Sequence, residues 1–332
     1  MTEPSLDVVA IGNAIVDVIA RADDELLAMH SLVKGSMQLV DTATAELLYD
    51  NMGPGLEMSG GSAANTLAGM AALGRSCAFI GQVRDDVLGK AFSHDIRALG
   101  IRFDTPARTE EPPTARCLIM VTPDAQRTMN TYLGASQHLP PAAIDADLIR
   151  SARILYLEGY LWDPEEPRSA MRGAMATARE AGREVAFTLS DAFVIERYRD
   201  DFRALIEDGL IDILFANEVE IMSLAQINDF EEAVALFAPK VSTLVVTRSE
   251  KGAIAIKNGE RFECGAAPVR EVVDTTGAGD LFAAGFLSGH VTGKGPVDCL
   301  AMGAIAAAEV ISHYGARPET DLKALMGGFL HA

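Results

Sequence analysis

Short apolar runs alternate with helix-forming stretches along most of this 332-residue chain, and this alternation constrains the fold more than any other feature. Residues 6–13 (LDVVAIGN) are typical of a buried strand, residues 62–74 (SAANTLAGMAALG) of a helix rich in small residues, and residues 77–83 (CAFIGQV) of another strand. A strand, a helix and a strand in succession form the unit of a parallel sheet. The sequence therefore predicts an α/β fold.

The same alternation continues into the C-terminal half. Strands are expected at 153–160, 184–190, 212–217 and 243–248, with helices near 165–181 and 199–208. A hairpin follows and turns at Asn258-Gly259, a pair suited to the positive φ angles of a type I′ turn. Helices dominate from there to the end.

Other short strands show more polar alternation, which is typical of a sheet with one wet face. They are expected at 15–21, 36–41, 115–121 and 127–133, with an amphipathic piece, DDELLAMH, between the first two. We interpret them as a small β-sheet lid. The chain is then one domain, 1–332, with lid segments at about 15–60 and 104–135 inserted in the α/β body.

The charge balance excludes several classes of partner. The chain has 47 acidic and 28 basic residues, a formal net charge of −19, and no stripe of Lys or Arg. Nucleic-acid binders usually present a basic face, so DNA, RNA and anionic membranes are disfavoured. The sequence has no long uncharged apolar window and no basic leader, so a cytoplasmic location is expected. The histidines and cysteines lack the spacing of a zinc site.

The stretch DTTGAGDLFAAGF (274–286) places acids, threonines and glycines where an apolar helix begins. Gly277, Ala278 and Gly279 would bring unpaired N–H groups and the positive end of the helix dipole to a phosphate. Asp280 stands beside this anion hole, where its carboxylate can accept a proton from an attacking alcohol. The pattern indicates phosphoryl transfer to a hydroxyl. The alternative is an N-capping Asp280 with glycines required only for packing.

Four motifs together resemble the signatures of the PfkB or ribokinase family of small-molecule kinases, in order and in spacing. They are GGSAANTLAGMAALG (60–74), GQVRDDVLGKAF (81–92), NEVE (217–220) and DTTGAGDLFAAGFL (274–287). The resemblance extends from Val8 to about Pro318. It implies a Rossmann-like three-layer α/β/α body of the ribokinase-like type, a lid over the acceptor, and ATP with Mg²⁺ beside the C-terminal segments.

The resemblance also implies an acceptor site. Asp17, next to Asn13, lies where relatives hold acceptor hydroxyls, and a carboxylate can accept from two vicinal hydroxyls of a ribose. Gly60 and Gly61 match a diglycine switch that permits lid rotation. Asn65, on the following helix, would contact the acceptor. For Asn13, Asp17 and Asn65 the alternative is local capping or turn bonding.

At the nucleotide end the resemblance implies roles for four further positions. Asn217 and Glu220 would organise Mg²⁺ through water, although an acidic helix start is the plain alternative. Thr247 and Gly252 would belong to the ATP loop TRSEKG, in which Ser249 stands where glycine is common.

Arg127 and a pair of residues, Asp274 and Thr276, complete the implied site. Arg127, from the lid, would reach the transferred phosphoryl group together with Mg²⁺. A lone surface arginine is the alternative. Asp274 and Thr276 match positions that hold a monovalent cation in relatives, which suggests K⁺.

The acceptor itself stays open between two classes. The long first lid insertion and QRTMNTYLGAS resemble the adenosine kinase branch, and Leu133 with other apolar side chains could enclose a purine or simply form lid core. These other side chains are Met37, Leu39, Tyr160 and Trp162. Glu158 instead resembles the acidic residue that binds sugar hydroxyls in ribokinases.

The hypothesis is therefore an ATP-dependent phosphotransferase acting on the hydroxymethyl group of a ribosyl compound, first of all adenosine or a related nucleoside. A sugar kinase for ribose, fructose or a keto-sugar is the alternative within the family. A catalytically silent protein that binds nucleotides or nucleosides is the alternative outside it. We expect a monomer or a homodimer under each of these hypotheses.

Overall fold

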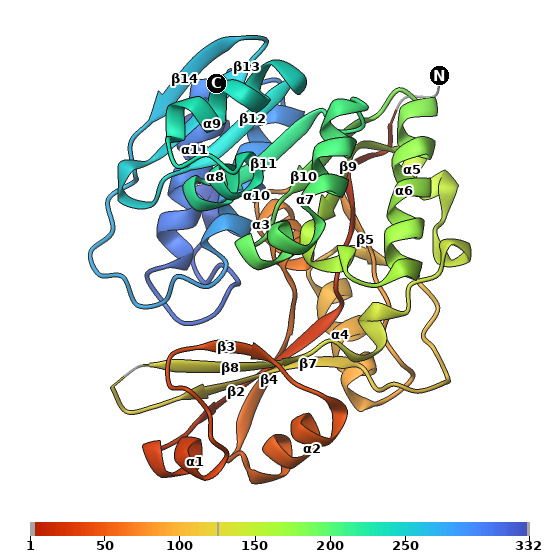
Figure 1. Cartoon of the computed structure of the whole chain (residues 1–332), viewed down its shortest axis with the longest axis vertical. Helices are drawn as coiled ribbons and strands as arrows, with labels where there is room; N and C mark the ends of the chain where they lie inside the picture. The colour runs from red at the N-terminus through yellow and green to blue at the C-terminus, as the bar shows by residue number, and fades with distance from the viewer. Residues whose placement is uncertain (1–3, 125, 331–332) are drawn as a thin grey trace.

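The computed structural model describes residues 4–124 and 126–330, and a large twisted sheet runs through its upper part (Figure 1). The strand order is β14-β13-β12-β11-β10-β9-β1-β5-β6, parallel from β12 to β6 and antiparallel in the β12-β13-β14 hairpin. The strands are β1 (Leu6–Ile11), β5 (Cys77–Ile80), β6 (Arg102–Phe103), β9 (Ala152–Glu158), β10 (Glu184–Thr188), β11 (Ile213–Asn217), β12 (Thr243–Thr247), β13 (Ala253–Lys257) and β14 (Glu260–Cys264). The α/β fold with a mainly parallel sheet is confirmed.

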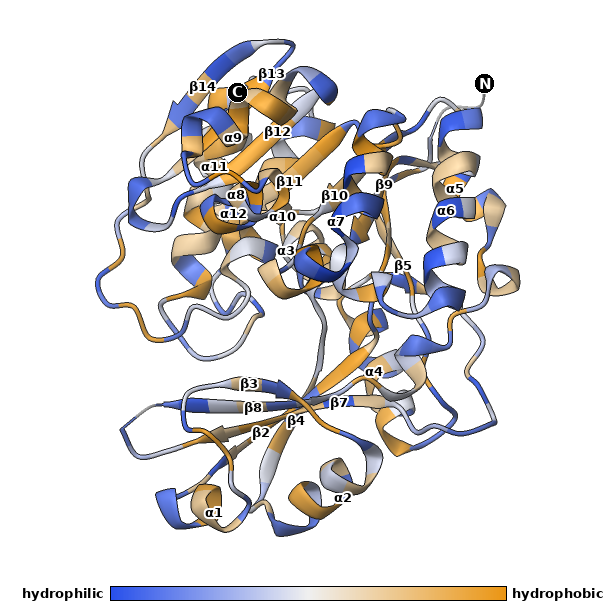
Figure 2. Cartoon of the chain, viewed as in Figure 1, coloured by the Kyte–Doolittle hydropathy of each residue, from blue (hydrophilic) through white to orange (hydrophobic). Residues whose placement is uncertain are grey.

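Helices cover both faces of this sheet, because the buried strands are apolar on both sides (Figure 2). Val8 and Ala10 of β1 belong to one core cluster, and Val9 and Ile11 to the other. The first cluster contains α3 (Ser62–Ala72), α4 (Val87–Ala98), α10 (Ala278–Val291) and α11 (Pro296–Val310). The second contains α5 (Ala146–Ser151), α6 (Glu165–Glu180), α7 (Ala192–Glu207), α8 (Glu218–Ala225) and α9 (Phe230–Phe237).

Helix α7 begins earlier than the sequence pattern indicates. Its predicted start, near 199, is wrong, because the Asp191 side chain caps the helix by accepting a hydrogen bond from the Phe193 amide. Tyr198 has non-helical angles, φ −124° and ψ 26°, and kinks the helix. The apolar spacing runs through the kink, from Val194 and Ile195 to Phe202 and Ile206, so the first half carried the same helical pattern as the second.

A second sheet lies below the main body in Figure 1, in the order β3-β8-β7-β2-β4. Its strands are β2 (Ile15–Arg21), β3 (Met37–Leu39), β4 (Gly55–Gly60), β7 (Ala115–Val121) and β8 (Arg127–Tyr132), and its helices are α1 (Asp24–Met29) and α2 (Thr42–Asn51). We call this sheet with its two helices the lid. The sequence analysis assigned neither α2 nor β4. Strand β4 is rich in glycine and largely exposed, and α2 buries only Ala45 and Leu48, so both patterns are weak.

The lid sheet has two different faces. Val16 and Val18 of β2 join the core cluster that includes Leu27 of α1 and Leu48 of α2. On the opposite, body-facing side, Ile15 forms a separate small cluster with Ala115, Cys117, Ile119 and, partly buried, Ile19, Met129 and Leu133. Asp17 stands on this inner face, opposite Cys117 in the pairing of β2 with β7.

Nothing in the described part of the chain is both long enough and apolar enough, as a helix, to cross a lipid bilayer.

Candidate active site

The site is centred on the N-terminus of α10. Gly277 precedes the helix with φ +77°, and a Cβ there would lie 2.7 Å from Ala316 Cβ, so glycine is required. A Cβ at Gly279 would meet nothing within 4 Å. In the described chain the backbone N–H groups of Gly279 and Asp280 have no hydrogen-bond partner. The first turn therefore presents open, unpaired donors, which is the arrangement that binds an anion.

Asp280 does not cap its own helix. Ser62 Oγ donates to its Oδ1 at 2.6 Å, and Asn65 Nδ2 donates to its Oδ2 at 3.0 Å. Burial raises the pKa of Asp280, whereas these two hydrogen bonds and the charge of Arg317 lower it. The capping alternative is wrong, because Gly277 is the N-cap and the carboxylate points to α3.

Asp17 is the second carboxylate of the site. Its Oδ2 would lie 2.4 Å from a Cβ at Gly60, so the glycine leaves room for the carboxylate. Among the described residues, no side chain or backbone N–H donates a hydrogen bond to the Asp17 carboxylate. Burial raises its pKa to about 6, Arg317 and Arg127 lower it, and Asp280 raises it. Asp17 is thus a carboxylate with free acceptor capacity beside Asp280.

Asn13 and Glu158 form the support under these groups. Glu158 Oε1 accepts from the Asn13 backbone N–H at 2.8 Å and from Asn13 Nδ2 at 2.7 Å, while Oε2 accepts from the Ala63 N–H at 2.7 Å. Burial raises the pKa of Glu158 to about 7. Its side chain is fully buried, and its carboxylate holds Asn13 and the start of α3. Contact of Glu158 with sugar hydroxyls stays a prediction.

Two side chains expected in the site have polar atoms without a hydrogen-bond partner among the described residues. Asn65 is 5% exposed, and its Oδ1 accepts no hydrogen bond. The Arg127 side chain, 8% exposed, forms an ion pair with Asp274 at 2.5 Å and lies 4.9 Å over the Tyr314 ring. None of its guanidinium nitrogens makes an aligned hydrogen bond within the described residues. Such groups are rare in folded proteins and point to a ligand.

The position expected to hold a monovalent cation is occupied by protein donors. Asp274 Oδ1 accepts from the Thr276 N–H at 3.1 Å and from Thr276 Oγ1 at 2.8 Å, and Oδ2 accepts from the Gly315 N–H at 3.1 Å. With Arg127 also paired to Asp274, this carboxylate already has its charge balanced. A cation at Asp274 and Thr276 stays a prediction.

Asn217 and Glu220 form a capping box at the start of α8. Asn217 Oδ1 accepts from the Glu220 N–H at 2.8 Å, and Glu220 Oε2 accepts from the Asn217 N–H at 3.0 Å. Burial raises the pKa of Glu220 to about 7. Residues 4–124 and 126–330 contain no group of three His, Cys, Asp or Glu side chains arranged to hold a metal. A role of Asn217 and Glu220 in organising Mg²⁺ through water stays a prediction.

The loop after β12 keeps a backbone suited to glycine. Gly252 has φ +86°, and a Cβ there would lie 2.0 Å from the Cys264 carbonyl oxygen. Ser249 adopts φ +50°, so it retains the left-handed conformation in spite of its side chain. Thr247 ends β12 beside Asn217. The role of Thr247 and Gly252 in an ATP loop stays a prediction.

The apolar side chains expected around the acceptor divide into two groups. Met37 and Leu39 are 40% and 47% exposed and pair with Met129 and Thr131 on the inner lid face. Leu133 borders a cavity of about 360 Å³ together with Leu39. Trp162 is instead fully buried against Phe187 and Phe202, with Nε1 donating to Asp201, and Tyr160 packs on Phe193. Including Trp162 in the acceptor wall was wrong.

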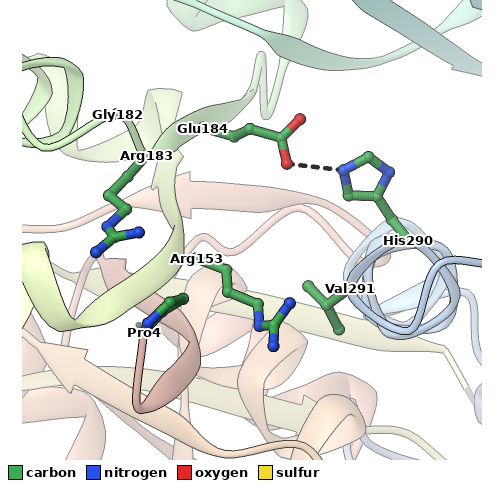
Figure 3. A pocket seen from close by; sticks show the side chains of 7 residues that line it. All are labelled: Pro4, Arg153, Gly182, Arg183, Glu184, His290 and Val291. Atoms are coloured by element: carbon green, nitrogen blue, oxygen red, sulfur yellow. Dashed lines mark hydrogen bonds and ion pairs between the residues drawn. The ribbon is translucent and has the colours of Figure 1, made fainter. Parts of the chain in front are cut away.

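Another cavity, of about 230 Å³, lies at the amino ends of the parallel strands, far from Asp280 (Figure 3). Asp280 and His290 stand near opposite ends of α10, about 15 Å apart along its axis. His290 Nε2 lies 2.8 Å from Glu184 Oε2, and Arg153 pairs with Asp7. This cavity has no part in the site described above.

Sequence reasoning missed three supporting residues: Ser62, Ser136 and Arg317. Ser62 could have been found, because it lies three residues before Asn65 and so on the same helix face. Ser136, whose Oγ donates to Asn13 Oδ1 at 2.8 Å, and Arg317 come from distant segments and leave no local signal.

The fold is that of a small-molecule kinase. The family model described as "pfkB family carbohydrate kinase" matches residues 55–322, and the chain belongs to that family. Members of this family are ATP-dependent phosphotransferases. The predicted ribokinase-like α/β fold is confirmed, because it matches the structures of PfkB kinases.

Solved structures and curated relatives carry names of both acceptor classes. The chain is 47% identical to a probable sugar kinase protein from Rhizobium etli CFN 42 (TM-score 0.91, covering 98% of this chain and 100% of that one). It is also 47% identical to the adenosine kinase from Sinorhizobium meliloti (TM-score 0.90, 97% and 99%). Fructokinase-2 of Solanum lycopersicum is 30% identical over 244 residues, 70% of this chain and 73% of the relative.

Proposed function

We propose that the protein transfers the terminal phosphoryl group of ATP to the hydroxymethyl group of a nucleoside, adenosine or a close relative, with Asp280 as general base. The observation that carries this proposal is the placement of Asp280. A buried carboxylate, oriented by Ser62 and Asn65, stands on an open helix N-terminus beside a second carboxylate with free acceptor capacity. A proton acceptor next to an anion site is what phosphoryl transfer to an alcohol requires.

The residues present fit the phosphates of ATP. The unpaired N–H groups of Gly279 and Asp280, and the space where a Cβ of Gly279 would project, support an anion site there. Thr247 and Gly252 are proposed to border the nucleotide. When bound, Mg²⁺ neutralises phosphate charge, and Asn217 with Glu220 is proposed to orient its waters. K⁺ at Asp274 and Thr276 is a further proposal.

The chain's own groups then divide the reaction between them. Ser62 and Asn65 fix both oxygens of Asp280, so one of them can take the proton of the hydroxymethyl group as it attacks. Arg127, whose charge is paired with Asp274 in this structure, is proposed to bring its guanidinium to the phosphoryl group. The free Oδ1 of Asn65 can accept from an acceptor hydroxyl. The N-terminus of α10, which we call the phosphate cradle, and the base Asp280 are thus proposed to be pre-organised before either substrate binds.

The acceptor is proposed to be a nucleoside because of what surrounds Asp17. Asp17 can accept from two ribose hydroxyls, with Asn13, Gly60 and Gly61 shaping the space around it. The inner lid face offers exposed Met37 and Leu39, and Leu133 at the cavity of about 360 Å³. A free pentose has no apolar part to cover these side chains, whereas a purine does. The Sinorhizobium meliloti adenosine kinase, similar over almost the whole chain, supports this choice.

A sugar kinase is the second candidate. The Rhizobium etli structure, described as a probable sugar kinase, is as similar to this chain, and the fructokinase relative belongs to the same family. In both candidates Asp280 and the α10 cradle act in the same way. Only the occupant of the inner lid face differs.

Asp280→Asn tests the shared chemistry. The amide keeps the shape but cannot take the proton, so turnover is expected to fall by roughly 10²–10⁴-fold while ATP binding, followed by calorimetry, stays near that of the wild type. Asp212→Asn is the control, because Asp212 is also a carboxylate whose pKa is raised by burial, but it accepts its hydrogen bond from the Val185 backbone N–H, away from the site. Turnover of Asp280→Asn equal to that of the control would remove Asp280 from the base role.

A further inference from the structure

One arginine outside the proposed catalytic set makes four hydrogen bonds across the site. Arg317 lies in the segment that follows α11. Its Nε and Nη2 donate to the Ser59 carbonyl oxygen at 3.0 and 2.8 Å, Nη2 donates to Ser59 Oγ at 2.9 Å, and Nη1 donates to the Ala64 carbonyl oxygen at 2.7 Å. A single guanidinium therefore joins the end of lid strand β4 to the first turn of α3.

These two attachment points flank the hinge between lid and body. Gly60 and Gly61 lie between Ser59 and α3, and Gly61 has φ +97° with the Asn13 carbonyl oxygen 2.3 Å from an added Cβ. The Ser59 N–H donates to Asp95 Oδ2 of α4 at 2.7 Å. The C-terminal end of lid strand β4, at Ser59, is thus held by Arg317 on one side and by Asp95 of α4 on the other.

The segment that carries Arg317 also contacts the anion site. Ala316 lies against Gly277, where an added Cβ would come within 2.7 Å of its own. The Gly315 N–H donates to Asp274, the partner of Arg127. Gly315 therefore contacts the ion pair of Arg127 with Asp274, Ala316 contacts the phosphate cradle at Gly277, and Arg317 contacts the hinge.

The charge of Arg317 is matched by carboxylates that it does not touch. All four of its hydrogen bonds go to carbonyl or hydroxyl oxygens. Burial lowers the pKa of Arg317 to about 10, and Asp17, Asp95 and Asp280 oppose this shift. A buried cation is costly without compensation, and here the compensation comes from groups that remain free to act. In return its charge lowers the pKa of Asp17 and of Asp280.

We propose that Arg317 is a positioning residue for phosphoryl transfer, which fixes the lid hinge to the phosphate cradle and balances the negative charge of Asp17 and Asp280 as the lid closes over them. The proposal rests on the roles proposed above for those two carboxylates. A planar guanidinium is needed for the fork of hydrogen bonds, and a positive charge of any shape is needed for the balance. The two parts can therefore be separated by substitution.

The test compares Arg317→Met and Arg317→Lys with the wild type in an ADP-release assay from pH 5 to 9. The acceptor is whichever of adenosine, ribose and fructose the wild type phosphorylates. Arg203→Met is the matched control, because Arg203 also donates to two carbonyl oxygens, those of Leu224 and Ala225, far from the site. The charged or titratable groups that influence Asp17 or Asp280, or are influenced by them, are Arg127, Cys117, Glu158, Tyr156, Tyr160 and Arg317.

Loss of the charge in Arg317→Met is expected to move the acid limb of kcat/KM upward by about one pH unit, because both carboxylates then hold their protons to higher pH. Arg317→Lys keeps the charge, so its acid limb should stay in place while the acceptor KM rises about 3- to 10-fold through the loosened hinge. Should the Met variant fail to fold, the Lys variant still tests the hinge.

Two results would overturn the proposal. One is an Arg317→Met acid limb that coincides with those of the wild type and Arg203→Met. The other is an acceptor KM of Arg317→Lys equal to the wild-type value. Either result leaves the proposed function standing as long as Asp280→Asn is inactive. If Asp280→Asn is active, the base assignment fails independently of Arg317.

Discussion

Ser62→Ala removes one of the two hydrogen bonds that hold the Asp280 carboxylate. The bond is 2.6 Å long and made to a buried carboxylate, and such bonds contribute about 1.5–3 kcal/mol. Since one pKa unit corresponds to about 1.36 kcal/mol, the loss should raise the pKa of Asp280 by about 1–2 units. The base is active only when ionised, so the acid limb of kcat/KM moves upward by the same amount. At pH values above this acid limb, kcat/KM of Ser62→Ala should return to most of the wild-type value.

The assay is the pH dependence of kcat/KM at saturating ATP, measured for the wild type, Ser62→Ala and Ser93→Ala. Ser93 is a matched control, because its Oγ also lies on a helix but donates only to the Gly89 carbonyl oxygen. An acid limb of Ser62→Ala that overlies both other profiles would refute the reasoning. It would mean that Asp280 does not titrate in the limiting step.

Two further predictions concern glycine geometry. Gly61→Ala is expected to lower the free energy of unfolding by about 2–4 kcal/mol in urea titrations, because φ is +97° and the Asn13 carbonyl oxygen is 2.3 Å from the new Cβ, whereas Gly279→Ala should keep full stability and raise the KM for ATP. Equal stability of the two variants would contradict this. Ser249→Gly should raise the free energy of unfolding by about 0.5–1 kcal/mol, since it relieves a left-handed φ of +50°, and a lower value would argue against strain there.

The sequence was sufficient for the body of the fold because its signals there are local. The buried strands carry continuous apolar runs, and Asn258-Gly259 has the two positive φ angles, 52° and 82°, that its turn type predicts. The start of α7 is set by the Asp191 cap, which the sequence analysis did not use, and β4 has little apolar pattern to detect.

The proposed site was only partly accessible from sequence, since its motifs fix residue types but not their partners. Glu158 looked like a sugar ligand, yet its fully buried side chain supports Asn13 and Ala63. Trp162 looked like part of a purine pocket, yet it belongs to the core. Arg317 carries no motif at all, because its contacts to Ser59 and Ala64 span more than 250 residues. Such long-range contacts follow from the folded topology alone.

A competition between acceptors tests the central claim most directly. Adenosine, ribose and fructose at equal concentrations, with ATP limiting, are incubated with the protein, and the phosphorylated products are counted by mass spectrometry. The proposal predicts adenosine 5′-monophosphate in more than about tenfold excess, because the apolar inner lid face contributes to the nucleoside alone. A phosphorylated free sugar as the main product would contradict the nucleoside assignment and leave the sugar kinase in its place.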